Sequence, residues 1–237
     1  MRPIRHTALA LAVLLSPVSL AAQLPTVAQV FDRYAEAVGG RDAWRGVQGR
    51  TDKGSADITF AGLSGSYTRH WALPNKHRLL IDLGVVTIDS GYDGVRGWEV
   101  QGGPPARMDS TEERDLAEPV ADGAYFLDPS RYAKAAVVGR ELYAGADAYK
   151  VALTSKAGLE SVDYFDAKTG LRIGTVRVRP TGESRVVYGD YKPFEGRMVP
   201  TRIVQDNGQG EVVLTITAVT FDALDATVFK SPLTDGR

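Results

Sequence analysis

The feature that most constrains the fold is an alternation of side-chain character with a period of two, repeated along most of the chain. In one stretch, Tyr67, Arg69 and Trp71 alternate with Thr68 and His70. Comparable alternation recurs in residues 78–83, 98–100, 149–154 and 212–217. A period of two places successive side chains on opposite faces of a strand. These segments are therefore predicted to be β-strands with two different faces.

Short turn sequences separate the predicted strands. They are Asp93-Gly94, Glu195-Gly196 and Asn207-Gly208. Pairs of this kind tolerate the positive φ angles that tight hairpins need. Strands joined by short turns pair antiparallel, and a sheet of about nine to eleven strands curls. The expected fold class is α+β and mainly β: a single curved antiparallel sheet, or half-barrel, with one concave face.

Two segments have helical character instead. Thr26 can cap a helix whose apolar residues recur at helical spacing until Gly39-Gly40 ends it. In the middle of the chain, residues 109–134 break the strand rhythm and contain the helical pattern "STEERDLAE" before Pro119. We expect the N-terminal helix and this mid-chain helical insert to cover the concave face of the sheet.

The N-terminal residues resemble an export signal. Arg2 and Arg5 precede a short apolar run over residues 8–15, and small residues follow up to Ala21 and Ala22. A membrane anchor is the alternative, but this run is shorter than the roughly 20 residues that span a bilayer. We therefore predict a signal peptide over residues 1–22, cleaved near Ala21 or Ala22. One periplasmic domain over residues 23–237 would follow, with no transmembrane segment.

Composition removes several classes of function. The chain has no cysteine, which excludes disulfides, thiol chemistry and a lipid anchor on an N-terminal cysteine, so a lipoprotein is not expected. Its 28 Lys+Arg and 29 Asp+Glu are mixed along the chain without a basic run. Because binding of nucleic acid needs clustered positive charge, a nucleic-acid partner is not expected.

Catalytic and metal-binding patterns are absent from the sequence. Outside the signal, histidine occurs only at His70 and His77, and no Gly-x-Ser-x-Gly elbow or phosphate-binding glycine loop is present. Asp163, Asp166 and Asp190 are separated acids near predicted turns, without the spacing of a metal site. We expect no enzyme activity, no cofactor and no metal.

The stretch "YFDAKTGL", residues 164–171, poses a specific choice. Its Asp166 precedes Lys-Thr-Gly by one extra residue, and so resembles the phosphorylated aspartate of cation pumps. A hairpin turn is the alternative. In that case the Asp166 carboxylate accepts hydrogen bonds from nearby backbone N–H groups, and Gly170 adopts a positive φ. Because no nucleotide site or parallel sheet is predicted, we interpret this stretch as a turn.

Aromatic and aliphatic side chains are the candidate ligand contacts. Plain core packing is the alternative for each of them. Arg69 shares a face with aromatic residues, so it needs an acceptor, which a ligand head group or backbone carbonyls could supply. The predicted cavity-lining set is Tyr67, Arg69, Trp71, Leu79, Ile81, Trp98, Tyr125, Phe126 and Tyr132.

A global resemblance extends these expectations. The stretches "YAEAVGGRDAWRGV", "GYDGVRGWEV", "YFDAKTGLRIG", "YGDYKPFEGRMVPTRI" and "LDATVFKSP" are similar, in order and spacing, to those of the outer-membrane lipoprotein-sorting (LolA/LolB-like) superfamily. More closely, they resemble a bacterial group of exported carrier-like proteins. The resemblance implies a half-barrel with helices in its mouth and an apolar cavity for acyl chains. The lipid-anchored receptor of that superfamily needs an N-terminal cysteine, so the resemblance favours a soluble carrier.

Three functions follow as hypotheses. The first is a soluble periplasmic binding or carrier protein for a lipid, acyl chain or lipoprotein. The second is a non-enzymatic interaction module or structural subunit of a cell-envelope complex. The third, a hydrolase, would need two acids that converge in the cavity, whereas the alternation places few acids on the inward faces.

Overall fold

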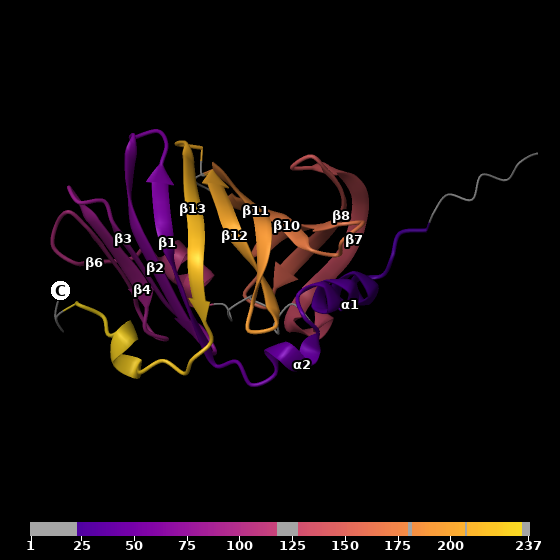
Figure 1. Cartoon of the computed structure of the whole chain (residues 1–237), viewed down its shortest axis with the longest axis horizontal. Helices are drawn as coiled ribbons and strands as arrows, with labels where there is room; N and C mark the ends of the chain where they lie inside the picture. The colour runs from indigo at the N-terminus through magenta and orange to yellow at the C-terminus, as the bar shows by residue number, and fades with distance from the viewer. Residues whose placement is uncertain (1–22, 118–127, 180–181, 207, 234–237) are drawn as a thin grey trace, which may run out of the picture.

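A single antiparallel sheet of thirteen strands forms the body of the protein in a computed structural model (Figure 1). The structure describes residues 23–117, 128–179, 182–206 and 208–233, so the predicted signal peptide lies outside the described residues. The strands are β1 (Gly49–Ile58), β2 (Leu63–Ala72), β3 (Lys76–Asp82), β4 (Thr87–Tyr92), β5 (Gly97–Gln101), β6 (Ala106–Arg107), β7 (Tyr132–Tyr143), β8 (Ala146–Ser155), β9 (Glu160–Asp166), β10 (Arg172–Arg179), β11 (Gly182–Phe194), β12 (Arg197–Asp206) and β13 (Glu211–Thr220).

The strand order is β6-β5-β4-β3-β2-β1-β13-β12-β11-β10-β9-β8-β7. Except for β1 and β13, neighbouring strands in the sheet are also consecutive in the sequence, as in a meander. The sheet is open, with β6 at one edge and β7 at the other. The chain between β6 and β7 therefore connects the two edges of the sheet.

This architecture confirms the predicted fold class, although the sheet has more strands than the expected nine to eleven. Strand β6 has only two residues, too few for alternation to be visible. Strand β7 begins at Tyr132, inside the segment 109–134 that we expected to be insert throughout.

In the described part of the chain, three α-helices accompany the sheet: α1 (Val27–Ala37), α2 (Arg41–Trp44) and α3 (Ser110–Ala117). The start of α1 is a capping box, because the N–H of Gln29 donates to the Thr26 hydroxyl (3.2 Å) and the N–H of Thr26 donates to the Gln29 side chain (2.8 Å). Gly39 and Gly40 end this helix with positive φ angles of 110° and 86°. Within the described residues, no helix is both long and apolar enough to span a membrane.

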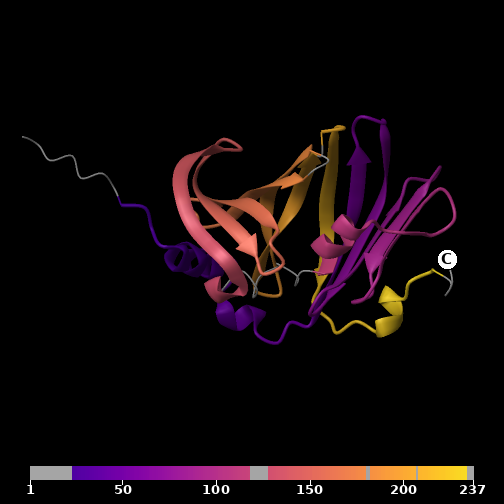
Figure 2. The same ribbon diagram turned by 180° about the vertical axis from the view of Figure 1, so that it is seen from behind.

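The main core lies on the inner face of the curved sheet. Phe31 and Val38 of the α1 region pack there with Leu214 and Ile216 of β13 and with side chains from both wings of the sheet. Figure 2 shows α3 on the same inner side, between the two wings. The helices thus cover the concave face, as the sequence predicts.

Part of the outer face is also covered, by the C-terminal segment with its 3₁₀ helix η3 (Ala226–Phe229). The guanidinium of Arg78 on β3 donates to the Val228 carbonyl (3.0 Å) and forms a bidentate ion pair with Asp89 on β4. Phe229 is fully buried. Apolar side chains are therefore buried on both faces of this sheet.

Candidate functional site

Five of the predicted cavity-lining residues lie together on the inner face of β2 and β3. Tyr67 is directly opposite Ile81, and Arg69 is directly opposite Leu79. Trp71 follows two residues after Arg69, on the same face. The side chains of Tyr67, Trp71 and Ile81 are almost completely buried, whereas Arg69 and Leu79 are half-buried. The alternation in the sequence therefore identified one continuous, mainly apolar surface.

Trp98 lies on the outer face, contrary to the sequence-based expectation. It is paired with Gly91, which is paired with Arg78, so all three residues share the face opposite to Tyr67. A Cβ atom on Gly91 would lie 2.5 Å from Cζ2 of Trp98, which means that the indole ring lies across this glycine. The physical reason is that the C-terminal segment covers part of the outer face near β3, so aromatic side chains such as Trp98 and Phe229 can be buried on that face.

Of the three other predicted aromatic residues, Tyr132 is the one that the structure describes. Tyr132, on β7, lies on the far wing of the sheet, where its ring is 6.2 Å from that of Phe31 on α1. Burial and the nearby Asp163 raise the pKa of the Tyr132 hydroxyl above its usual range. Tyr125 and Phe126 lie outside the described residues.

One side of the site is bounded by α1, which is fastened to two hairpins. Arg33 donates to the carbonyl oxygens of Ala167 (3.0 Å) and Lys168 (3.3 Å) in the β9–β10 turn. At the C-terminal end of the helix, the Val38 carbonyl accepts from the N–H of Met198 on β12 (3.1 Å). A Cβ atom on Gly39 would lie 2.3 Å from the Gly196 carbonyl oxygen. This close backbone packing fixes α1 on the rim of the sheet.

The other side is covered by α3, which packs on β3, β4 and β5. The Glu113 carboxylate accepts from the N–H of Gly97 (3.0 Å) and from Nε of Arg107 (3.0 Å). The hydrogen bond from Arg107, followed by that from Gly97, lowers the pKa of Glu113. The Asn75 amide donates to the carbonyl of Ala117 (2.9 Å). Because the Arg107 side chain is 59% exposed, its ion pair adds little to the stability of this contact.

Two ion pairs are buried within the site. On β1, Nε of Arg50 donates to Oδ1 of Asp52 (2.5 Å), and both side chains are almost completely buried. On the opposite wing, Arg172 of β10 donates to Asp163 of β9 (3.1 Å) and to the Thr175 hydroxyl, which itself donates to Asp163 (2.6 Å). Burial disfavours the charge of Arg172, yet the field of Asp163 raises its pKa above the usual range.

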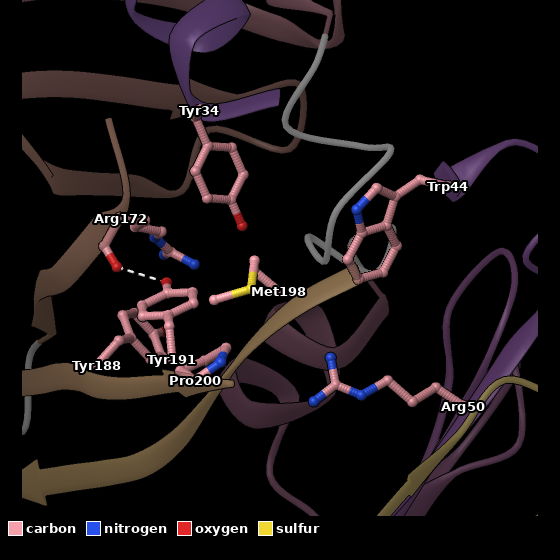
Figure 3. Close-up of a pocket in the computed structure, with 8 residues that line it drawn as sticks. All are labelled: Tyr34, Trp44, Arg50, Arg172, Tyr188, Tyr191, Met198 and Pro200. Atoms are coloured by element: carbon pink, nitrogen blue, oxygen red, sulfur yellow. Dashed lines mark hydrogen bonds between the residues drawn. The ribbon is translucent and has the colours of Figure 1, made fainter. Parts of the chain in front are cut away.

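A pocket lies between these two ion pairs, beneath α1 and α2 (Figure 3). It encloses about 20 Å³, which is room for roughly one water molecule. Its lining combines aromatic rings, a thioether and two guanidinium groups. The lining residues are Tyr34, Trp44, Arg50, Arg172, Tyr188, Tyr191, Met198 and Pro200.

Some buried polar atoms of the inner face lack a partner in the part of the chain that the structure describes. They include Oδ2 of Asp52 and Nε1 of Trp71. The register places Trp71 opposite Arg50 and Asp52 opposite Arg69, so both orphan atoms belong to the same face of β1 and β2. An unpaired buried donor or acceptor costs roughly 1–3 kcal/mol, and a bound water or ligand group removes that cost.

The groups considered for catalysis are dispersed. His70 lies on the outer face, where its Nδ1 is 2.9 Å from the Thr51 hydroxyl, and burial lowers its pKa. His77 is on β3, on the inner face opposite Trp71. The described residues contain no group of three or more His, Cys, Asp or Glu side chains placed to hold a metal ion.

None of the residues that line the pocket belongs to the cavity-lining set predicted from the sequence. Arg50 and Asp52 belong to the alternating stretch "GRTDKGSADI", but charged side chains on a strand are normally interpreted as solvent-facing. Arg172 follows the turn "DAKTG" and gives no separate signal. One pattern could have indicated a buried pair: Arg50 and Asp52 have opposite charges at positions i and i+2 of a strand and therefore share a face, and Arg69 lies opposite Asp52 on the next strand.

Comparison with known proteins supports the architecture. No family model matches the sequence, and no curated protein matches it. A DUF1329 family protein from Desulfovibrio piger has a TM-score of 0.59 at 14% identity, over 86% of this chain and 97% of that chain. A LolA superfamily protein from Nitrosomonas europaea has a TM-score of 0.55 at 14% identity, over 88% and 99%.

A third similar structure is a putative outer membrane lipoprotein-sorting protein domain from Vibrio parahaemolyticus, with a TM-score of 0.54 at 12% identity over 86% of this chain and 97% of that one. Identities this low show a shared fold and no more. The chain therefore has the fold of LolA-like and lipoprotein-sorting proteins, and the predicted resemblance is confirmed at the level of architecture.

Proposed function

We propose that this protein is an exported, non-catalytic carrier that binds the acyl chain of a lipid or lipoprotein on the inner face of its sheet. The observation that carries the proposal is the different kind of attachment of the two helices over that face. Close backbone packing against two hairpins fixes α1, whereas among the described residues α3 is tied to the sheet by hydrogen bonds of the Glu113 and Asn75 side chains. The shared fold with lipoprotein-sorting proteins agrees with this proposal.

The ligand would enter on the side of α3. This helix, "STEERDLA", is mostly polar, so it buries little apolar surface, and its displacement costs little free energy. On the inner face of β2 and β3, near α3, lie Leu79 and Ile81, together with Tyr67. Movement of α3 would expose these side chains to an acyl chain while α1 keeps the opposite rim in place.

The place of action follows from the same proposal. A carrier for lipids or lipoproteins acts between membranes, and the predicted signal peptide over residues 1–22 would deliver the protein to the periplasm. The proposed ligand contacts are the inner-face residues Tyr67, Arg69, Trp71, Leu79 and Ile81, with Tyr132 on the opposite wing.

A second candidate is a non-enzymatic interaction module of the cell envelope. Two observations favour it: the pocket encloses only about 20 Å³, and edge strand β7 carries the exposed side chains Val138 (53%) and Leu142 (78%). An edge strand with exposed apolar residues can pair with a strand of another protein. A module of this kind would bind a protein without taking up a lipid.

Native mass spectrometry of protein isolated from the cell envelope distinguishes the two candidates. The carrier proposal predicts an added mass in the range of a fatty acid or phospholipid, and uptake of a fluorescent fatty acid after the protein has been stripped of lipid. The absence of both added mass and uptake, with a stable protein complex in the same sample, would favour the interaction module.

A further inference from the structure

The pocket beneath α1 has a chemical character that differs from the apolar surface of β2 and β3. Figure 3 shows the guanidinium groups of Arg50 and Arg172 directed into the pocket from opposite sides, with the hydroxyl of Tyr34 above them. The side chain of Met198 lies among these three groups. Two cations and a hydroxyl donor thus converge on one small volume.

Rigid partners hold both guanidinium groups in place. Asp52 accepts from Nε of Arg50, and Asp163 with Thr175 accepts from Arg172. The guanidinium of Arg172 also lies 4.8 Å from the centre of the Tyr188 ring. A guanidinium that is already oriented loses little conformational freedom when it binds a carboxylate or phosphate.

A third arginine near the pocket, Arg197, has its own acidic partner. Its guanidinium lies 4.4 Å from the ring of Phe221 and forms an ion pair with the exposed Glu195 (3.6 Å). Arg50 and Arg172 are therefore the two buried cations that face the pocket, each beside one aspartate. A guanidinium has five N–H donors, so each of the two can donate to an anion while it keeps its aspartate, and such bonds are strong in surroundings of low dielectric constant.

We propose that this pocket binds the anionic head group of the carried amphiphile, a carboxylate or a phosphate monoanion, between Arg50 and Arg172. This inference rests on the proposed carrier function, to which it adds the class of ligand: an acyl chain that bears an anionic head group. The unbranched side chain of Met198 can change rotamer and enlarge the pocket for the head group. The chain would continue from the pocket along the aromatic inner face.

Binding of two probes with the same chain tests the inference. Delipidated protein is titrated with hexadecanoate and with hexadecanol, below the concentrations at which they aggregate, and acetate is added as a competitor. We expect hexadecanoate to bind about tenfold or more tightly than hexadecanol, because only the acid presents an anion to the guanidinium groups. Acetate, which lacks the chain, is expected to compete only at far higher concentrations.

Variants assign the preference to the pocket. Tyr34→Phe and Arg50→Gln should reduce the preference for hexadecanoate at least threefold while the affinity for hexadecanol is kept. Tyr34→Phe leaves both ion pairs in place, so it remains informative if Arg50→Gln does not fold. The control is Arg140→Gln, which removes an exposed arginine of edge strand β7 that pairs with Asp147 of β8 and should leave the preference unchanged.

Each contrary outcome has a definite meaning. Equal affinity of the unmodified protein for the two probes would overturn the head-group site and leave the carrier function standing. Failure to bind either probe would overturn both proposals. Competition by acetate at concentrations similar to those of hexadecanoate would show a site for small anions, which would also overturn the inference.

Discussion

Gly170 in the β9–β10 turn lies directly against the backbone of Arg33 on α1: a Cβ atom on the glycine would come within 2.9 Å of the Arg33 carbonyl oxygen. Gly170 also has a φ of 77°, in the region that favours glycine. The Arg33 side chain extends past it to the carbonyls of Ala167 and Lys168. The turn "DAKTG" therefore packs directly against α1, and Gly170 is needed both for the positive φ of the turn and for the close contact with the helix.

Replacement of this glycine should loosen α1. Gly170→Ala combines the cost of a positive φ with a backbone clash, so we expect the free energy of unfolding to fall by about 2 kcal/mol or more. Gly158→Ala is the matched control, because Gly158 has a similar φ of 84° and no atom within 4 Å of an added Cβ. It should cost about 1 kcal/mol. Urea denaturation gives both values, and equal losses of unfolding free energy would contradict a close contact between Gly170 and α1.

Much of this fold could be predicted from local patterns. The alternation identified the strands, and short turns predicted antiparallel pairing. The competing interpretation of Asp166 as a phosphorylation site was correctly rejected: its carboxylate accepts from the N–H groups of Lys168 and Thr169, both at 2.7 Å, as a turn aspartate does. These features depend on neighbours in the sequence, and for that reason they are visible in it.

The site was less predictable, because it depends on which faces are covered. The face of Trp98, for example, follows from alternation only when the register of β4 and β5 is known. Tyr92 pairs with Gly97, which places Trp98 on the face opposite to Tyr92. The C-terminal segment that makes the outer face a place for buried aromatic residues is far away in sequence. The buried Arg50 and Arg172 were missed for a related reason. A charged side chain is expected to face solvent, and these two are buried only because each has an aspartate partner that the fold brings next to it.

The buried network of Arg172 should be highly sensitive to the loss of one partner. Asp163→Ala leaves the Arg172 guanidinium in the core without its carboxylate, so we expect stability to fall by about 3–5 kcal/mol. The double replacement Asp163→Leu with Arg172→Met removes both charges and should recover most of the loss. Asp147→Ala, which breaks an exposed ion pair with Arg140, is the control and should change the denaturation midpoint little. A double variant no more stable than the single one would contradict this account.

Alkaline pH should destabilise the outer-face tyrosine pair. The rings of Tyr143 and Tyr164 stack with centroids 3.8 Å apart, and burial raises the pKa of each hydroxyl to about 12. The unfolded chain loses these protons near pH 10, and the folded protein retains them until about pH 12. Between these values the folded state binds more protons, so stability decreases as pH rises.

The Tyr164→Phe variant tests this linkage. It removes one of the two titrating groups, and with it the hydrogen bond from the Tyr164 hydroxyl to Glu141 (3.0 Å), so its stability should be lower at neutral pH. Its loss of stability from pH 10 to pH 12 should be smaller than that of the unmodified protein, as measured by urea denaturation at each pH. Identical slopes for the two proteins would show that this pair does not control the alkaline transition.

Locking α3 to the sheet should block ligand entry. An added Cβ on Gly97 would lie 3.1 Å from Cγ of Glu113, close to the spacing between Cβ and the partner sulfur in a disulfide. Because the chain has no cysteine, Gly97→Cys with Glu113→Cys introduces the only thiols. The oxidised protein should take up a fluorescent fatty acid much more slowly than the reduced one. The two single variants are the controls, and equal uptake in both redox states would exclude α3 as the entry side.

The proposed binding surface is tested most directly by two neighbouring leucines of β3. Leu79 lies on the inner face opposite Arg69, and Leu80 lies on the outer face opposite Thr68. Both leucines are half-buried, so they differ mainly in the face on which they lie. The measurement is the affinity of the delipidated protein for a fluorescent fatty acid. We predict that Leu79→Gln weakens binding about tenfold, as removal of a buried apolar contact should, while Leu80→Gln leaves it unchanged. Equal affinities for the two folded variants, or no binding by the unmodified protein, would contradict the inner-face carrier account.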